Sequence, residues 1–400
     1  MINYSEALEI IKKEIPKLSI TTEEVDIFES LNRILAEDVI ADVDLPPFDN
    51  SAMDGYAIKF SERTQWNIIG EISAGNFSSF TLTENDAVLI TTGSKLPLNA
   101  DTTIPIEDVE VNGNKFTLKQ NSFFKKGMNI RTQGNDLKKD EIAVHHSTKI
   151  NSKTIAVLAS CGKEKVKVYS KLKAAILAAG DELIPVNQKP EEDKLRVSNI
   201  YSFYAALKEM NHAVIKLGFT KDDKEIIRQK IKAALEIRID ILITTGGVSV
   251  GKYDFLKDIF EEQGVVEKFW KVNIKPGKPI YFGVYEKDNK RILVFGLPGN
   301  PVSSLVNFYF FIKLAIEQLF NQKSLNRIKA ILQNELKKKD GKRHFARGIL
   351  CEENDKWKVT SEFSQSSGNL VEMSRANCLI ILEEEKTNPA KGEIVECILI

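Results

Sequence analysis

From residue 171 to about residue 320 the chain alternates between short apolar runs and amphipathic stretches. The apolar runs have the length of strands, and the stretches between them have the 3.6-residue spacing of helices. The expected strands are 172–178, 213–217, 239–244 and 292–295, with extended segments at 265–274 and 279–284. The expected helices are 198–210, 221–237, 253–262 and 302–320. This alternation predicts a doubly wound, mostly parallel sheet.

The rest of the chain has other patterns. Apolar positions recur at helical spacing in residues 4–15, and a second helix is expected at about 27–35. Residues 56–144 carry short alternating runs broken by Gly, Asn and Asp, which favours a small antiparallel β domain. After a linker at 321–324, short strands return up to residue 400 and predict a small β-barrel or sandwich.

Composition narrows the class of protein. A chain of 400 residues is expected to form several domains, and 42% hydrophobic with 28% charged residues is typical of a folded protein. Lys+Arg and Asp+Glu are both 56, so no net charge attracts nucleic acid or a membrane surface. No leader pattern or membrane-length apolar run is present, which indicates a cytoplasmic protein. The four cysteines form no CxxC pair and are expected to be reduced packing residues.

Three glycine-rich loops each follow an apolar run of strand type. They are residues 245–251, 274–279 and 296–301. Parallel strands place such loops at one edge of the sheet, where backbone N–H groups can bind an anion. Lys271, Lys275 and Lys278 add positive charge around the second loop. The sequence therefore predicts a site for phosphate or another tetrahedral oxyanion.

Carboxylates are expected near the same edge of the sheet. They are Glu182, Asp222, Asp223 and Asp254. Lysines combined with carboxylates suit a phosphoryl or nucleotidyl reaction, in which the carboxylates hold Mg²⁺. The chain has no GxxxxGK[ST] loop, no GxGxxG after the first strand and no GxSxG elbow, which disfavours ordinary nucleotide hydrolases, dinucleotide folds and serine hydrolases.

Three polar loops lie outside the predicted sheet domain. They contain Asp54 (residues 44–56), Thr92 (residues 90–97) and Asp136 (residues 127–136). The first, with two prolines, is either a stiff connection or a site loop. From their residues alone, each of the other two is either a hairpin turn or a site loop.

Long and unusual motifs in this chain resemble those of the MoeA family, the molybdopterin molybdenumtransferases, which share their architecture with the E domain of gephyrin. The motifs are residues 48–57, 180–183, 245–251, 274–279 and 296–303. The resemblance implies a multidomain α/β plus β fold. The implied domains are an elongated discontinuous α+β domain (1–45 with 145–170), a small β domain (46–144), a MogA-like α/β domain (171–322) and a C-terminal β-barrel (323–400).

The resemblance also implies a reaction, in which molybdate is inserted into adenylylated molybdopterin with release of AMP, assisted by Mg²⁺. It implies a homodimer with the active site between subunits, and transient contact with the adenylyltransferase and molybdoenzymes. The implied catalytic residues are Asp54, Thr92, Asp136, Lys271, Lys275 and Ser367. The implied substrate- and cofactor-binding residues are Gly246, Gly247, Ser249, Gly277, Gly299 and Asn300, and the implied metal ligands are Glu182, Asp222 and Asp254.

The chain departs from the family pattern at Ala178-Ala179, where Ser or Thr is usual before Gly180-Asp181-Glu182, so two hydroxyl groups are missing. Asp222 and Asp223 remain alternatives for one ligand position. Two other functions stay open. The first is a molybdopterin adenylyltransferase, which would turn over ATP without molybdate. The second is a non-catalytic scaffold of the gephyrin kind, which would need fused modules or a peptide groove.

Overall fold

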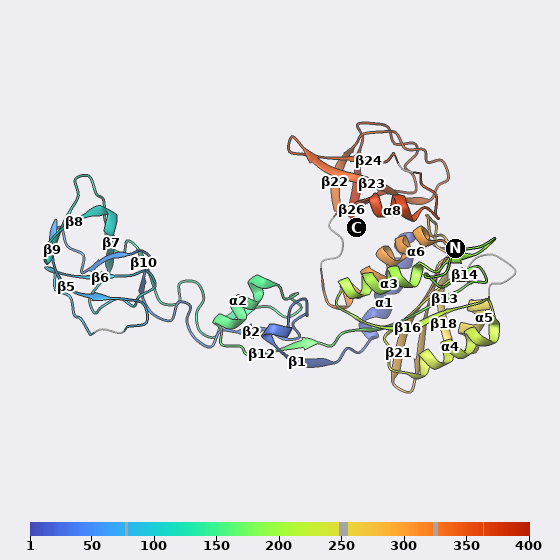
Figure 1. Cartoon of the computed structure of the whole chain (residues 1–400), viewed down its shortest axis with the longest axis horizontal. Coiled ribbons are helices and arrows are strands. Elements are labelled where there is room, and N and C mark those ends of the chain that lie inside the picture. The colour runs from blue at the N-terminus through green and yellow to red at the C-terminus, as the bar shows by residue number, and fades with distance from the viewer. Residues whose placement is uncertain (77–78, 248–254, 323–326, 363) are drawn as a thin grey trace. The chain divides into compact units, whose positions relative to one another are not determined.

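The computed structural model describes residues 1–76, 79–247, 255–322, 327–362 and 364–400 (Figure 1). The chain forms two compact units. The large unit comprises Met1–Glu23, Asn32–Ile34 and Val168–Ile400, and the small unit comprises Glu24–Leu31 and Leu35–Lys167. Each unit has its own sheets and its own core. The four domain boundaries expected from the sequence stay a prediction.

The large unit is built on a six-stranded sheet of order β16-β13-β17-β21-β20-β18. Its strands are β13 (Lys173–Ala179), β16 (Ala213–Thr220), β17 (Ile241–Thr245), β18 (Val265–Trp270), β20 (Tyr281–Lys287) and β21 (Lys290–Leu297). The four strands from β16 to β21 are parallel, which confirms the mostly parallel prediction. β20 and β18 are antiparallel, because a two-residue turn with positive φ at Asp288 and Asn289 folds β20 directly back onto β21.

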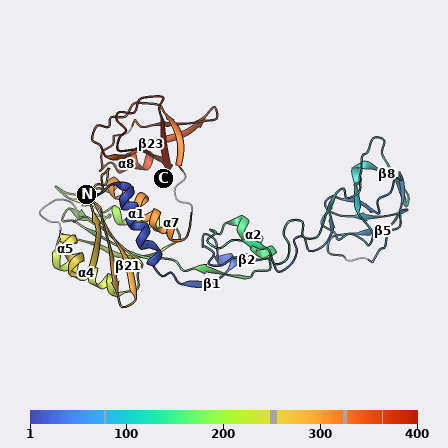
Figure 2. The same ribbon diagram turned by 180° about the vertical axis from the view of Figure 1, so that it is seen from behind.

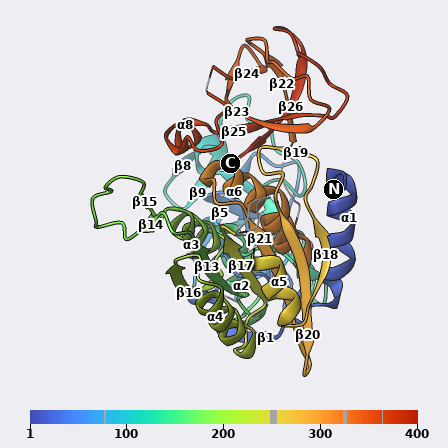
Figure 3. The same ribbon diagram turned by 90° about the vertical axis from the view of Figure 1, so that its right-hand side faces the viewer.

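Helices cover both faces of this sheet (Figures 1 and 3). On one face lie α1 (Tyr4–Glu14), α3 (Asn199–Glu209) and α6 (Pro301–Asn307), and on the other lie α4 (Lys224–Glu236) and α5 (Phe255–Glu262). Successive residues of β13 alternate between the two cores: Ala174 and Ile176 face the first, and Ala175 and Leu177 face the second. This burial on both faces explains why the strands are continuous apolar runs.

One helical stretch among the described residues, Pro301–Leu319, is long and apolar enough to cross a membrane. It consists of α6, a π-helical segment (Phe308–Lys313) and α7 (Leu314–Leu319). Its large side chains, Phe308, Phe310 and Phe311, are fully buried in the core of the large unit. Packing inside the protein therefore accounts for the apolar character of this helix.

The C-terminal part of the large unit is a closed five-stranded barrel, in which β23 also pairs with β25 (Figure 2). Its strands are β22 (Arg327–Leu332), β23 (Arg343–Glu353), β24 (Lys356–Thr360), β25 (Cys378–Leu382) and β26 (Ile394–Leu399), with a short helix α8 (Leu370–Arg375). Phe345, Met373 and Leu379 belong to the same core as α1 and α6, so the barrel packs firmly onto the α/β part. The predicted barrel is confirmed.

The small unit contains a second six-stranded sheet, of order β7-β4-β6-β5-β9-β8. Its strands are β4 (Gly55–Ile58), β5 (Gln65–Ile72), β6 (Asp86–Ile90), β7 (Thr102–Pro105), β8 (Val109–Asn112) and β9 (Lys115–Leu118). All pairs are antiparallel except β5 with β6. The antiparallel prediction is therefore wrong for this one pair, whose strands are joined by a long loop rather than by a hairpin turn.

Short elements complete the small unit and its junctions: β1 (Thr22–Asp26), β2 (Val39–Ile40), β3 (Asn50–Ser51), β10 (Ile130–Arg131), β11 (Ile142–Val144), α2 (Ser152–Ser160) and β12 (Lys165–Tyr169). The helix predicted at 27–35 is wrong, because only Ile27–Glu29 forms a 3₁₀ turn. Asp26 caps this turn by accepting a hydrogen bond from the Phe28 N–H at 2.8 Å. Asn32 then adopts a positive φ, which ends any helix.

Candidate functional site

A cavity of about 280 Å³ lies at the carboxyl ends of β13, β17 and β21, the edge that the sequence predicts for ligand binding. Its walls are formed by residues 178, 182–183, 195–199, 245, 299–301 and 368. Three predicted site residues are among them: Glu182, Gly299 and Asn300. Ala178 also lines the cavity, so the departure from the family pattern lies at the site itself.

Gly246 fixes how closely the strand ends approach one another. It has a φ of +87°, and a Cβ atom there would lie 2.0 Å from the carbonyl oxygen of Ala179. Its N–H donates to the Leu297 carbonyl at 3.1 Å, which ties the end of β17 to the end of β21. Only glycine fits this position, because any side chain would collide with the backbone of β13. Gly247 follows with a φ of +63°.

Asn199 connects two walls of the cavity, and reasoning from the sequence missed it. Its Nδ2 donates to Thr245 Oγ1 at 2.7 Å and to the Gly299 carbonyl at 2.8 Å. Thr245 Oγ1 in turn donates to the Pro298 carbonyl at 2.8 Å. The loop after β21 is thus held by side chains from α3 and β17. The available signal was an asparagine in the first turn of a helix that packs beside the strand ends.

The carboxylates after β13 and β16 form a close group. Asp181 Oδ1 accepts a hydrogen bond from the Asp222 N–H at 3.1 Å. Asp222 Oδ1 is buried and has no hydrogen-bond partner among the residues that the structure describes. Burial raises the pKa of Asp222, and the negative charges of Asp181 and Glu182 raise it further. Among the described residues, no positive charge therefore offsets that of an ionised Asp222.

Asp223 has a different role from Asp222. Its carboxylate caps α4 and accepts hydrogen bonds from the N–H groups of Glu225 at 2.9 Å and Ile226 at 3.0 Å. Asp222, with an oxygen left unpaired, is the better candidate for a ligand. Ser249 and Asp254, two further predicted site residues, lie outside the described residues. No group of three metal-ligating side chains is present in the part of the chain that the structure describes.

We expect Asp222→Asn to raise the stability of the unliganded protein at neutral pH. A raised pKa means that the folded state binds this proton more tightly, so stability falls as the pH rises from the unfolded-state value of about 4 through the raised folded-state pKa. Asparagine does not ionise, so the variant does not lose stability in this way as the pH rises. In denaturant unfolding, the variant should have a higher free energy of unfolding than the wild-type protein at pH 7, and this difference should shrink toward pH 4. An equal or larger difference at pH 4 would contradict this account.

The two predicted lysines do not line the 280 Å³ cavity. Lys271 has a φ of +70°, and its Nζ lies 3.5 Å from the centroid of the Trp270 ring. Lys275 belongs to β19 (Ile274–Lys275), which pairs with β23 of the barrel. Its Nζ lies 3.6 Å from Asp340 Oδ2, and its side chain is 56% exposed. Lys275 is therefore accessible to an anion.

The loop after Lys275 is anchored against the end of α6. Gly277 has a φ of +101°, and a Cβ atom there would lie 2.4 Å from Asn307 Oδ1. The buried Asn307 also donates through Nδ2 to the Gly277 carbonyl at 3.0 Å. Gly277 thus holds the backbone in place, and the structure gives it a packing role beside the predicted binding role.

Ser367 lies at the junction between the barrel and α6. Its carbonyl accepts a hydrogen bond from the Val302 N–H at 3.1 Å, in the first turn of α6. The buried Arg347 holds the preceding residues by donating to the carbonyls of Ser366, at 3.0 Å, and of Ser364. Gly368, the next residue, lines the 280 Å³ cavity. The barrel therefore contributes to this edge of the sheet.

In the small unit, Asp54 and Thr92 are in direct contact. Asp54 Oδ1 accepts hydrogen bonds from the Thr92 N–H at 2.6 Å and from Thr92 Oγ1 at 2.8 Å. The backbone hydrogen bond, followed by the hydroxyl, lowers the pKa of Asp54 below its ordinary value. Asp54 is therefore a fixed, ionised carboxylate at neutral pH.

Asp136 lies on a neighbouring loop of the small unit. Its Oδ2 is 2.5 Å from the Arg131 guanidinium, and its N–H donates to the Leu45 carbonyl at 2.9 Å. Arg131 pairs with Asn50 across β10 and β3, which brings this loop beside the one that carries Asp54. The predicted site residues that the structure describes are thus divided between the two units, and those of the large unit lie partly at the 280 Å³ cavity and partly around Lys271 and Lys275.

Comparisons with known proteins match the whole length of the chain. Three family models fit: MoeA N-terminal region (domain I and II) at residues 2–162, probable molybdopterin binding domain at 175–318, and MoeA C-terminal region (domain IV) at 329–400. A molybdopterin molybdenumtransferase of Haemophilus influenzae is 36% identical over 94% of this chain and 93% of its own. One of Bacillus subtilis is 33% identical over 95% and 90%.

Solved structures agree with the sequence comparisons. Two crystal structures of the molybdopterin biosynthesis protein MoeA from Pyrococcus horikoshii resemble this chain. One has a TM-score of 0.83 at 28% identity and covers 100% of both chains. The other has a TM-score of 0.79 at 29% identity and covers 100% of this chain and 99% of its own.

Proposed function

We propose, since this chain belongs to the MoeA family of molybdopterin molybdenumtransferases, that it inserts molybdate into adenylylated molybdopterin and releases AMP. The enzyme is a transferase of molybdenum cofactor biosynthesis. The observation that carries the proposed reaction is the 280 Å³ cavity at the carboxyl ends of three parallel strands, the usual place for a nucleotide in such a sheet.

We assign the phosphate groups of the substrate to the loops after β17 and β21. Gly246, Gly247 and Gly299 have no side chain that would keep a ligand away from the backbone of these loops, and Asn300 follows at the wall of the 280 Å³ cavity. Asn199 keeps these loops in place before substrate binds, so less order has to be gained on binding. Lys271 and Lys275 are assigned to molybdate and to the charge of the leaving AMP.

Magnesium fits the carboxylates of this edge. The buried, unpaired oxygen of Asp222 lies near the more exposed carboxylates of Asp181 and Glu182, and the three form a negatively charged group. Mg²⁺ is usually held by one or two protein carboxylates together with substrate phosphates and water, so two described ligands are sufficient. We propose Glu182 and Asp222 as ligands, and Asp254, which lies outside the described residues, as a third. Bound Mg²⁺ would neutralise the phosphates of the substrate.

AMP release tests the proposed reaction. The purified protein with Mg²⁺ and adenylylated molybdopterin should release AMP when molybdate is added. Release at the same rate without molybdate would refute the assignment. An adenylyltransferase would instead consume ATP with molybdopterin, and a scaffold would do neither, so the same assay separates the three functions.

We further propose that the active form is a homodimer with the active site between subunits. The small unit exposes large apolar side chains that a partner could cover: Phe28 is 87% exposed and Leu31 is 50% exposed. Asp54 of one copy would then act with Lys275 of the other. The free cysteines, 161, 351, 378 and 397, suit the reducing cytoplasm, where the adenylyltransferase and the molybdoenzymes would be transient partners.

Mixing two inactive variants tests this arrangement. If Asp54→Ala and Lys275→Ala subunits exchange at random, half of the dimers contain both kinds, and each of those has one intact site of two. The mixture should then recover about a quarter of the wild-type rate, because a two-fold dimer has two equivalent sites. No recovery after verified subunit exchange would mean that Asp54 and Lys275 act within one copy.

A further inference from the structure

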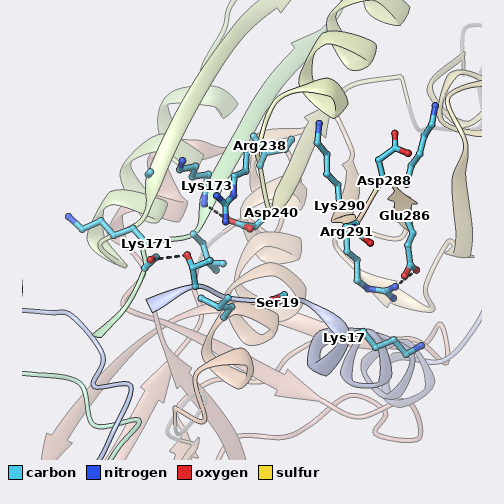
Figure 4. A pocket seen from close by; sticks show the side chains of 18 of the residues that line it. Lys17, Ser19, Lys171, Lys173, Arg238, Asp240, Glu286, Asp288, Lys290 and Arg291 are labelled. Atoms are coloured by element: carbon cyan, nitrogen blue, oxygen red, sulfur yellow. Dashed lines mark hydrogen bonds and ion pairs between the residues drawn. The ribbon is translucent and has the colours of Figure 1, made fainter. Parts of the chain in front are cut away.

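A second and larger cavity, of about 720 Å³, lies on the large unit at the amino ends of its parallel strands (Figure 4). Its walls are formed by Ala213 and by four segments, within residues 17–23, 170–173, 238–240 and 286–291. β13 begins there and ends at the 280 Å³ cavity, so the two cavities are separated by the length of the strand, about 20 Å. The volume suits a metabolite of nucleotide size. The proposed reaction gives this cavity no role.

Basic side chains predominate in the lining. Seven are basic (Lys17, Lys171, Lys173, Arg238, Lys287, Lys290 and Arg291) and four are acidic (Glu23, Asp240, Glu286 and Asp288), which leaves three more positive than negative charges. Three of the basic groups have partners among the described residues. Arg291 pairs with Glu14 and Glu286, Lys17 pairs with Glu14, and Lys290 donates to the Glu236 carbonyl.

The other basic groups have no ion pair within the part of the chain that the structure describes. Among them, Lys173 and Arg238 lie close together beside Asp240 (Figure 4). The positive charges of Lys173 and Arg238 repel each other, and a bound anion would offset this repulsion. The guanidinium of Arg238 can bind two oxygens of one phosphate, and the ammonium of Lys173 can bind a third.

Asp240 supplies a different contact. It lies where β17 begins, and its Oδ2 accepts a hydrogen bond from the Lys173 N–H at 2.7 Å. Burial raises the pKa of Asp240, and the nearby positive charges of Arg238 and Lys173 oppose this effect. A carboxylate beside the two cations would repel a bare anion but would accept a hydrogen bond from a hydroxyl group. The lining therefore favours a ligand that carries both an anionic group and a hydroxyl group.

We propose that this cavity is a second small-molecule site, which binds the phosphate of a phosphorylated polyhydroxy metabolite through Lys173 and Arg238 and a hydroxyl of that metabolite through Asp240. The site is independent of the proposed reaction at the other edge of the sheet. Two segments of its wall, 17–23 and 170–173, are those by which the chain leaves and re-enters the large unit. They are joined there by a hydrogen bond from the Ser170 N–H to the Thr21 carbonyl at 2.8 Å.

Isothermal titration calorimetry with ribose 5-phosphate as the probe tests the site. The wild-type protein should bind ribose 5-phosphate more tightly than inorganic phosphate, and ribose without phosphate should not bind measurably. Lys173→Ala with Arg238→Ala should weaken binding of ribose 5-phosphate at least tenfold. The matched control is Lys329→Ala with Lys356→Ala, which removes two positive charges from exposed positions of the barrel and should leave binding unchanged.

Two further variants locate the binding. Lys271→Ala with Lys275→Ala should keep the affinity for ribose 5-phosphate, because these lysines lie outside the cavity. Asp240→Ala should reduce the preference for ribose 5-phosphate over inorganic phosphate. Hydrogen exchange should show protection at residues 19–23 and 170–173 when the probe binds. Absence of binding, or full affinity in a folded Lys173→Ala, Arg238→Ala variant, would overturn the proposal.

Discussion

Lys275→Ala is expected to slow molybdate-dependent AMP release at least roughly tenfold, a barrier increase of about 1.4 kcal/mol. Lys275 is the half-exposed last residue of β19, and Asp340 is the one carboxylate among the described residues that forms an ion pair with its Nζ, at 3.6 Å. An exposed ion pair of this kind contributes little to stability, so the ammonium remains available to an oxyanion. Alanine removes that charge, while the anchor between Gly277 and Asn307 is kept.

A neighbouring lysine provides the control for this variant. Lys342 Nζ lies 3.9 Å from the same Asp340 Oδ2, and Lys342→Ala removes an equal charge beside that carboxylate. We expect Lys342→Ala to keep nearly the full rate. An equal loss of rate in both variants would show that the effect comes from the charge balance around Asp340 and that Lys275 has no role of its own.

Asp54→Ala is likewise expected to slow AMP release at least roughly tenfold. Asp54 is held in one orientation by two hydrogen bonds from Thr92 and is ionised at neutral pH. Such a fixed carboxylate suits the positioning of a substrate group, and positioning contributes strongly to rate. The loss should appear in the rate at saturating substrate, with the unfolding transition little changed.

The chain offers a closely matched control in the same sheet, at the opposite end of β6 from Thr92. Asp86, the first residue of β6, accepts hydrogen bonds from the Thr83 N–H at 3.1 Å and from Thr83 Oγ1 at 2.5 Å, the same pair of contacts that Asp54 makes with Thr92. Asp86→Ala should therefore lose a similar amount of local structure and keep its activity. Equal rates in Asp54→Ala and Asp86→Ala would mean that Asp54 only anchors its loop and has no role in the reaction.

The α/β architecture could be predicted because its strands are buried on both faces. β13, β17 and β21 are short, mostly apolar runs of strand length, as expected for strands buried on both faces. The helix predicted at 27–35 failed for the opposite reason. Two of its five apolar residues, Phe28 and Leu31, are exposed, and Leu35 donates its N–H to the carbonyl of Thr148, a residue far away in the sequence. Such a pairing cannot be read from a local pattern.

The site could be predicted only in part. Glycine-rich loops after strands indicated the edge of the sheet, and the structure places Gly246 and Gly299 there. The separate roles of Asp222 and Asp223 depend on where α4 begins, and sequence patterns locate helix ends only to within a few residues. The contacts of Asn199 and the cavity around Asp240 depend on distant segments coming together, so the position of Asn199 in the first turn of its helix was the one local signal for either.

The molybdenum content of the product tests the central claim most directly. After a single turnover with Mg²⁺, molybdate and adenylylated molybdopterin, the pterin product is separated from the protein and from free molybdate, and its metal is measured beside the AMP released. We predict that molybdenum in the pterin and AMP in solution appear in equal amounts, and that neither appears when molybdate is left out. AMP released in the presence of molybdate, with no molybdenum in the pterin, would contradict the proposed function.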